Sequence, residues 1–191
     1  KRDAKTEQPL QGAEFALTTK DDIVNAAGEI LVSAGTILQK AVSNAEGQAL
    51  FTADLPVGYR YGVQETQAPL GYKINNETYE FAFEADGSGI PVAEFTHDFK
   101  NEQIYASLEL KKQDLEAGTA QGDASLAGAV YGLYAREDVL HPDGKTGVLF
   151  EAGSLVTTMT TDDQGSAFID SLYPGRYFLK EITPSPGYAL D

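Results

Sequence analysis

The stretch YGVQETQAPLGY at residues 61–72 returns as YFLKEITPSPGY at residues 177–188. Each copy is an alternating run that contains a glutamate, Glu65 or Glu181, and ends in a turn rich in proline and glycine. One copy alone would predict a β-strand that runs into a turn. Two copies indicate that the chain is a repeat and that the glutamate is part of the repeated unit.

The repeat continues on the N-terminal side of this stretch. LQGAEFAL at residues 10–17 matches LAGAVYGL at residues 126–133. The segment at residues 43–66 likewise matches residues 161–182, with the turns NAEG and DDQG at equivalent positions. The two copies therefore predict two domains, which join around residues 102–106.

Within each copy the apolar residues recur with a period of two, which is typical of β-strands. Two face-sharing sets illustrate this pattern: Tyr79, Phe81 and Phe83, and then Phe95, His97, Phe99 and Asn101. No segment has a sustained helical period, although residues 20–33 could hold a short helical turn. We predict an all-β protein of two tandem antiparallel β-sandwich domains, residues 1–103 and 104–191.

The composition excludes several classes of function. The chain has 14 basic and 29 acidic residues, and both predicted domains are acidic, so neither offers a surface for nucleic acid or an anionic membrane. It contains no cysteine and only two histidines, which excludes disulfides, cysteine-based zinc sites and histidine-rich metal sites. No apolar run approaches the roughly 20 residues of a membrane span. We expect no cofactor.

Charged side chains occur at positions that the alternation directs inward. In SLELKKQD at residues 107–114, Lys112 shares a face with Leu108 and Leu110. The triplet Lys112-Gln113-Asp114 matches Lys1-Arg2-Asp3, so the same lysine opens each domain. The remaining inward polar residues are Glu65, in register with Tyr61 and Val63; Glu181, in register with Tyr177 and Leu179; and Asn101, in register with Phe95 and Phe99.

Lysine, glutamate and asparagine on inner strand faces predict one specific reaction. Burial lowers the pKa of a lysine and raises that of a glutamate, so a proton can pass from the amine to the carboxylate. The neutral amine is a nucleophile, and the glutamic acid can polarise the asparagine side-chain carbonyl and protonate the leaving ammonia. The product would be an intramolecular Lys–Asn isopeptide bond, formed once per molecule without turnover.

The motifs resemble a known family. KRD and KQD, LQGAEFAL and LAGAVYGL, DDQGSAFIDSLYPGRYFLKEIT, and APLGY and SPGY are similar to the motifs of Cna B-type (SpaA-like, prealbumin-like) repeats of Gram-positive surface adhesins and pilins. The resemblance covers nearly the whole chain twice and implies Ig-like, prealbumin-like sandwiches. It also implies an isopeptide bond between Lys1 and Asn101 with Glu65 as the catalytic residue. In the second domain it assigns Lys112 and Glu181 to the same roles.

The second copy departs from the family pattern. The repeat places its asparagine beyond residue 191, so we expect this domain to lack its last strand here and to expose a sheet edge. For Lys1, Glu65 and Asn101 of the first domain, the alternative interpretation is a buried salt bridge with a capping amide and no covalent product.

Other features favour ordinary structural roles. His97 could join the reactive cluster, but a lone strand histidine is more often a packed residue. HPDGKTG at residues 141–147 is expected to be a hairpin loop rather than a calcium site. Tyr59, Tyr61, Tyr173 and Tyr177 could stack on sugars, but their alternation favours core packing.

The resemblance implies structural stalk or spacer modules of an extracellular, cell-wall-anchored protein of a Gram-positive bacterium, and not a turnover enzyme. The expected partners are neighbouring repeats of the same chain and, through a C-terminal sorting signal outside it, peptidoglycan. The alternatives are an adhesive module that binds a host matrix protein or glycan, with residues 20–35 as its candidate, and a polymerising pilin subunit.

Overall fold

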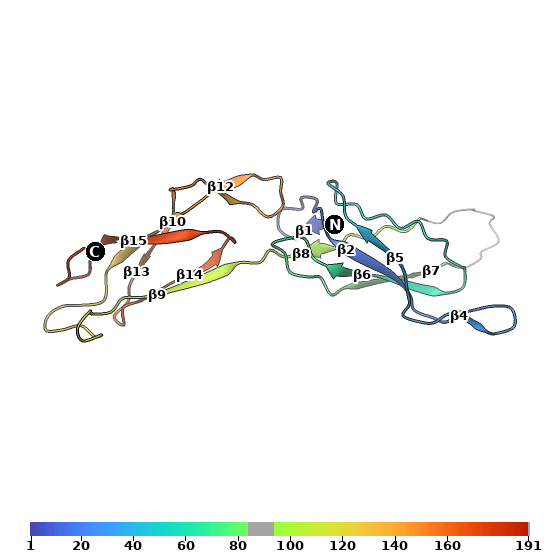
Figure 1. Ribbon diagram of the computed structural model, residues 1–191, viewed down its shortest axis with the longest axis horizontal. Coiled ribbons are helices and arrows are strands. Elements are labelled where there is room, and N and C mark those ends of the chain that lie inside the picture. The colour runs from blue at the N-terminus through green and yellow to red at the C-terminus, as the bar shows by residue number, and fades with distance from the viewer. Residues whose placement is uncertain (84–93, 191) are drawn as a thin grey trace. The chain divides into compact units, whose positions relative to one another are not determined.

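The computed structural model describes residues 1–83 and 94–190. The chain divides into two compact units, Lys1–Gln103 (unit 1) and Ile104–Asp191 (unit 2). Across the described residues every regular element is a β-strand, which confirms the predicted all-β class (Figure 1). These residues accordingly include no helix long and apolar enough to cross a membrane.

Unit 1 is built on a four-stranded antiparallel sheet. β2 (Glu14–Thr19) lies between β5 (Ile37–Val42) and β6 (Arg60–Gln67). β7 (Thr78–Ala82) pairs with the other edge of β6, so the strand order is β5-β2-β6-β7. The strands that carry the repeated motifs therefore form the middle of the sheet.

The core of unit 1 lies on one face of this sheet. Phe15 and Leu17 of β2 and Tyr61 and Val63 of β6 are buried there, because alternate side chains of a strand point to the same face. Partly buried side chains pack against this cluster: Val32, Leu38, Ala49, Phe51, Ala53, Leu55, Tyr59, Tyr79, Phe81 and Phe83. The apolar residues of segment 49–55 thus cover the sheet.

Aromatic rings of β7 meet those of the segment that leads to the last strand of unit 1. The ring pairs are Tyr79–His97, Phe81–Phe95, Phe83–Phe95 and His97–Phe99, with centroids 4.3–5.0 Å apart. These contacts confirm that the two alternating runs each present one aromatic face.

A short parallel pair brings the two ends of unit 1 together. β1 (Arg2–Asp3) pairs with β8 (Lys100–Asn101), and Asp3 lies opposite Asn101. The labels of β1 and β8 lie next to each other in Figure 1. The first and last strands of the unit are therefore direct neighbours.

The short helical turn suggested for residues 20–33 is wrong. This segment forms a hairpin of β3 (Ile23–Val24) and β4 (Ile30–Val32). The side-chain oxygen of Asn25 accepts hydrogen bonds from the amides of Ala27 and Glu29. Asparagine side chains that bond nearby backbone groups favour turns over helices, which explains the outcome.

Unit 2 repeats the central part of this plan. β10 (Val130–Ala135) lies between β13 (Leu155–Thr160) and β15 (Tyr177–Thr183), in antiparallel pairing. A second sheet pairs β9 (Ala106–Lys111) with β14 (Ser166–Leu172). The hairpin of this unit consists of β11 (Val139–Leu140) and β12 (Val148–Phe150).

The two units differ at the edge of the main sheet. In unit 1, β6 is covered on its outer side by β7, whereas β15 pairs only with β10 among the described residues. β15 is therefore an edge strand of its sheet. In the described part of the chain, no strand pairs with the backbone groups along its outer side.

Candidate functional site

Unit 1 brings together three side chains from three segments that are far apart in sequence. Lys1 immediately precedes β1, Glu65 lies in β6, and Asn101 ends β8. The parallel pairing of β1 with β8 places Asp3 opposite Asn101 and brings the Lys1 side chain within reach of Asn101. Alternation in β6 directs Glu65 to the buried face. The sequence predicted this set of residues.

The three groups contact one another directly. The Lys1 amine donates a hydrogen bond to the side-chain carbonyl oxygen Oδ1 of Asn101. Its Nζ also lies 3.0 Å from Oε1 of Glu65. The amide nitrogen Nδ2 of Asn101 donates to both carboxylate oxygens of Glu65, at 2.9 Å each. Each of the three polar groups therefore contacts both of the others.

Burial makes this cluster chemically unusual. The side chains of Lys1 and Glu65 are 1% and 0% exposed, and Asn101 is 1% exposed. The rings of Phe15 and Phe99 lie 5.5 and 6.0 Å from the Lys1 amine. Burial lowers the pKa of the Lys1 amine, although its hydrogen bond to Glu65 opposes the shift. The amine is thereby moved towards its neutral, nucleophilic form.

Glu65 faces the amide nitrogen of Asn101 rather than the carbonyl oxygen. The sequence predicts a glutamate that polarises that carbonyl, but the Lys1 amine occupies this place. The backbone N–H of Asn75 donates to Oε2 of Glu65 at 2.6 Å and fixes the carboxylate from the other side. Glu65 is thus placed to receive a proton from the amine and to deliver one to the leaving nitrogen.

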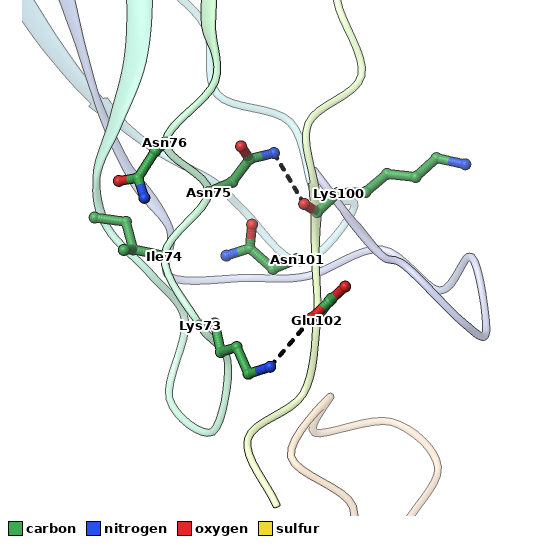
Figure 2. A pocket seen from close by; sticks show the side chains of 7 residues that line it. All are labelled: Lys73, Ile74, Asn75, Asn76, Lys100, Asn101 and Glu102. Carbon is green, nitrogen blue, oxygen red and sulfur yellow. Dashed lines mark hydrogen bonds and ion pairs between the residues drawn. The ribbon is translucent and has the colours of Figure 1, made fainter.

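A pocket of about 280 Å³ lies next to Asn101. Figure 2 shows the Asn101 side chain between the segment of residues 73–76 and the segment of residues 100–102. Hydrogen bonds between Asn75 and the Lys100 carbonyl, and between Lys73 and Glu102, connect the two walls. The pocket thus borders the buried cluster at Asn101.

Unit 2 contains two members of the same set. Lys112 Nζ lies 2.8 Å from Oε1 of Glu181, and their side chains are 8% and 3% exposed. Lys112 is buried whereas Lys111 is exposed. Burial acts to lower the pKa of Lys112, but hydrogen bonds with Glu181 and Tyr131 outweigh it and raise that pKa. This lysine is therefore held as the charged partner of a buried ion pair.

A family model described as SpaA, a prealbumin-like fold domain, matches residues 1–96 and again residues 106–191. The chain belongs to this family. The two matches confirm the resemblance seen in the motifs, and the two units can be called SpaA-type domains.

Three solved structures are similar to this chain to different degrees. The Bacillus anthracis TIE protein is 23% identical with a TM-score of 0.64, and the match covers 98% of this chain and 28% of that chain. A streptococcal ancillary pilin is 18% identical with a TM-score of 0.41, covering 98% of this chain and 53% of that one. The minor pilin of Streptococcus agalactiae is 19% identical with a TM-score of 0.31, covering 97% and 76%.

The chain thus spans about a quarter of the TIE chain and about half of the ancillary pilin. The match to the TIE protein shows a shared fold. No curated protein matches the sequence significantly.

Sequence reasoning missed an aspartate–tyrosine pair that both SpaA-type domains contain. The Tyr72 hydroxyl donates to Asp3 at 2.8 Å, and the Tyr188 hydroxyl donates to Asp114 at 3.0 Å. Both partners belong to motifs that are visible twice in the sequence, the aspartate of KRD and KQD and the tyrosine that ends APLGY and SPGY. Because this aspartate and this tyrosine recur together in both copies of the repeat, the sequence held a signal that could have revealed the pair.

The remaining candidates have structural roles. His97 stacks on Tyr79 with an interplanar angle of 8°, and its Nε2 lies 2.8 Å from Glu77. HPDGKTG is the loop of the β11–β12 hairpin, as predicted, and the Asp143 carboxylate accepts hydrogen bonds from the backbone amides of residues 145 and 146. The described residues hold no cluster of metal ligands.

Of the four tyrosines weighed as sugar-stacking residues, Tyr59 and Tyr61 lie in the unit 1 core. Tyr61 is fully buried, and its hydroxyl donates to the Pro56 carbonyl. The Tyr177 hydroxyl similarly donates to the carbonyl of Tyr173, and Tyr59 packs against the unit 1 core. The contacts confirm the prediction of core packing for Tyr59 and Tyr61, whereas Tyr173 and Tyr177 are half-buried.

A turn glycine touches the backbone of the lysine in each domain. Gly47 has φ of +75°, and a Cβ atom there would lie 2.3 Å from the Lys1 carbonyl oxygen. Gly165 has φ of +76°, and its Cβ would lie 2.5 Å from the carbonyl oxygen of Lys112. Because backbone atoms cannot yield cheaply, only glycine fits at this turn without moving the lysine.

We expect Gly47→Ala to destabilise unit 1 more than Gly28→Ala. Gly28 has φ of +82°, and no atom lies within 4 Å of the position that an added methyl group would take. Its substitution therefore lowers the free energy of unfolding only through backbone strain, by about 1–2 kcal/mol. Gly47→Ala adds a steric clash of about 1–3 kcal/mol. Denaturant unfolding of both variants measures the difference, and equal losses would show that the contact with Lys1 imposes no constraint.

Proposed function

We propose that the chain is a pair of structural stalk or spacer modules from a Gram-positive surface adhesin or pilin, and that unit 1 stabilises itself by a Lys1–Asn101 isopeptide bond. The observation that carries this proposal is the buried contact of Lys1, Glu65 and Asn101. Membership of the SpaA family supports the structural role.

The reaction follows from the positions of the three groups. The Lys1 ammonium passes a proton to Glu65 across 3.0 Å, and the neutral amine attacks Cγ of Asn101. Glu65, now protonated, gives its proton to Nδ2 at 2.9 Å as the C–N bond of the amide breaks. The carboxylate then accepts the second amine proton. One C–N bond forms, one breaks, and one ammonia leaves with the surplus proton as ammonium.

The geometry supplies proximity that a free amine and amide lack. Groups held in reacting geometry behave as if present at very high concentration, and the surrounding rings keep the amine out of water. The carboxylate serves first as base and then as acid and is regenerated, but the lysine and asparagine are consumed. The site therefore acts once and has no turnover.

Such a bond suits an extracellular module. The chain has no cysteine with which to form a disulfide, and an amide is not broken by reductants. The bond would join the first and last strands of unit 1, so a pulling force could not peel them apart. The net charge of −15 favours a well-solvated surface. These properties support a location on the outer surface of the cell wall.

Intact mass tests the bond. The purified chain is expected to weigh less than its sequence by one ammonia, and Glu65→Ala should restore the full mass because the proton carrier is lost. Glu181→Ala is the matched control and should keep the deficit. Peptide mapping should then find the Lys1 and Asn101 peptides joined. A wild-type chain of full mass would refute the proposal.

A further inference from the structure

The Asp3 side chain is a buried carboxylate with four hydrogen-bond donors. Asp3 is 1% exposed. Its Oδ1 accepts from the backbone amides of Lys5 at 2.7 Å and Thr6 at 2.8 Å. Its Oδ2 accepts from the Tyr72 hydroxyl at 2.8 Å and from Nε2 of Gln103 at 3.1 Å. Buried carboxylates need such partners, and here each oxygen accepts two hydrogen bonds.

These donors come from the three segments that carry the reactive residues. Lys1 lies two positions before Asp3, and Gln103 lies two positions after Asn101. Tyr72 belongs to the segment that links Glu65 to Asn75, whose N–H in turn donates to Glu65. One carboxylate therefore ties together the lysine segment, the glutamate segment and the asparagine segment.

Backbone hydrogen bonds complete the same junction. The Arg2 amide donates to the Phe99 carbonyl, and the Ala4 amide donates to the carbonyl of Asn101. The Lys73 amide donates to the Glu102 carbonyl. Burial alone would raise the pKa of Asp3, but hydrogen bonds from Thr6, Tyr72, Lys5 and Gln103 hold it below its usual value. These hydrogen bonds thus favour the ionised form of the carboxylate.

We propose that Asp3 is a positioning residue for the cross-linking reaction: its four hydrogen bonds bring the Lys1, Glu65 and Asn101 segments into reacting register. Asp3 does not touch the reacting atoms. The inference rests on the proposed Lys1–Asn101 bond. A displacement of about 1 Å can slow a positioned reaction about 100-fold, so a junction outside the chemistry can control its rate.

Unit 2 repeats part of the junction. The Asp114 carboxylate accepts from the amides of Glu116 and Ala117 and from the Tyr188 hydroxyl. Its side-chain amide donor is Gln121, seven residues along the same loop, rather than a residue after a last strand. Asp114 therefore joins only the lysine and glutamate segments. This difference makes it a matched control for Asp3.

The experiment follows ammonia loss in the full chain, which is recovered unfolded and unlinked from inclusion bodies in denaturant and then refolded. Intact mass gives the rate of bond formation, and circular dichroism gives the rate of folding. We expect Asp3→Asn to fold and to lose ammonia at least about tenfold more slowly than the wild type. Tyr72→Phe and Gln103→Ala should each slow the reaction less. Asp114→Asn should leave the rate unchanged.

A stability control separates positioning from simple destabilisation. Ile23→Ala weakens the unit 1 core away from the junction, so once folded it should cross-link at the wild-type rate. In a Glu65→Gln background, where no bond forms, Asp3→Asn should shift the side-chain amide resonance of Asn101 and Ile23→Ala should not.

Each outcome is decisive. A folded Asp3→Asn chain that reacts as fast as the wild type, or no more slowly than Ile23→Ala, overturns the inference while leaving the bond established. A wild-type chain that keeps its ammonia overturns both proposals together. If Asp3→Asn does not fold, normal rates for Tyr72→Phe and Gln103→Ala overturn the inference.

Discussion

Asn101→Ala is expected to lower the free energy of unfolding of unit 1 by about 4.7 kcal/mol. The variant keeps the Lys1–Glu65 ion pair, so the main change is loss of the proposed cross-link. On the chain-entropy model, closing a loop of about 100 residues constrains the unfolded state by about this amount. Hydrogen exchange of the backbone amides of β2 and β6 in the full chain measures the change for unit 1 alone.

Glu65→Gln provides the second route to an unlinked chain. It should destabilise unit 1 at least as much as Asn101→Ala, because it also leaves the buried Lys1 amine without its carboxylate. Amides of β10 and β15 in unit 2 should exchange as in the wild type in both variants. Unchanged exchange in unit 1 for Asn101→Ala would contradict a stabilising bond.

Glu181→Leu is expected to lower the free energy of unfolding of unit 2 by about 3–5 kcal/mol. The substitution leaves the ammonium of Lys112 buried with its carboxylate partner gone, and removing one member of a buried ion pair typically has this effect. Tyr131 and Tyr188, whose rings lie 5.9 and 5.3 Å from the amine, replace only a small part of the lost interaction. Hydrogen exchange of β10 and β15 reports the change.

The double variant Lys112→Met, Glu181→Leu is the control. Replacing both members of a buried pair with apolar side chains of similar size is often neutral or stabilising. The double variant should therefore recover most of the stability that Glu181→Leu loses. A double variant as unstable as the single one would show that the loss comes from packing at residue 181 and not from an unpaired charge.

The fold could be predicted because alternation and repetition agree. Phe15 and Leu17, and then Tyr61 and Val63, are spaced for one buried face, and each motif occurs twice. The structure of residues 20–33 could not be predicted in this way, because the spacing of their apolar residues suits either a helical turn or a short hairpin. The side-chain hydrogen bonds of Asn25 decide between the two.

The members of the site could be predicted, but their orientation could not. Inward alternation placed Lys1, Glu65 and Asn101 at facing positions, which is a property of strands. Which oxygen or nitrogen each group meets depends on the backbone N–H of Asn75, which bonds Glu65 from a segment without periodicity. For the same reason sequence reasoning missed the bond between Asp3 and Tyr72.

The parallel register of β1 and β8 also bears on folding kinetics. Arg2 pairs with Lys100 and Asp3 with Asn101, so the unit closes through contacts between its two ends. Contacts of such sequence separation make folding slow, because the chain must close a long loop before it gains them. A Lys1–Asn101 bond would keep that loop closed through any later unfolding. The first folding would then be the slowest, and each refolding would start from a ring that already has its ends in place.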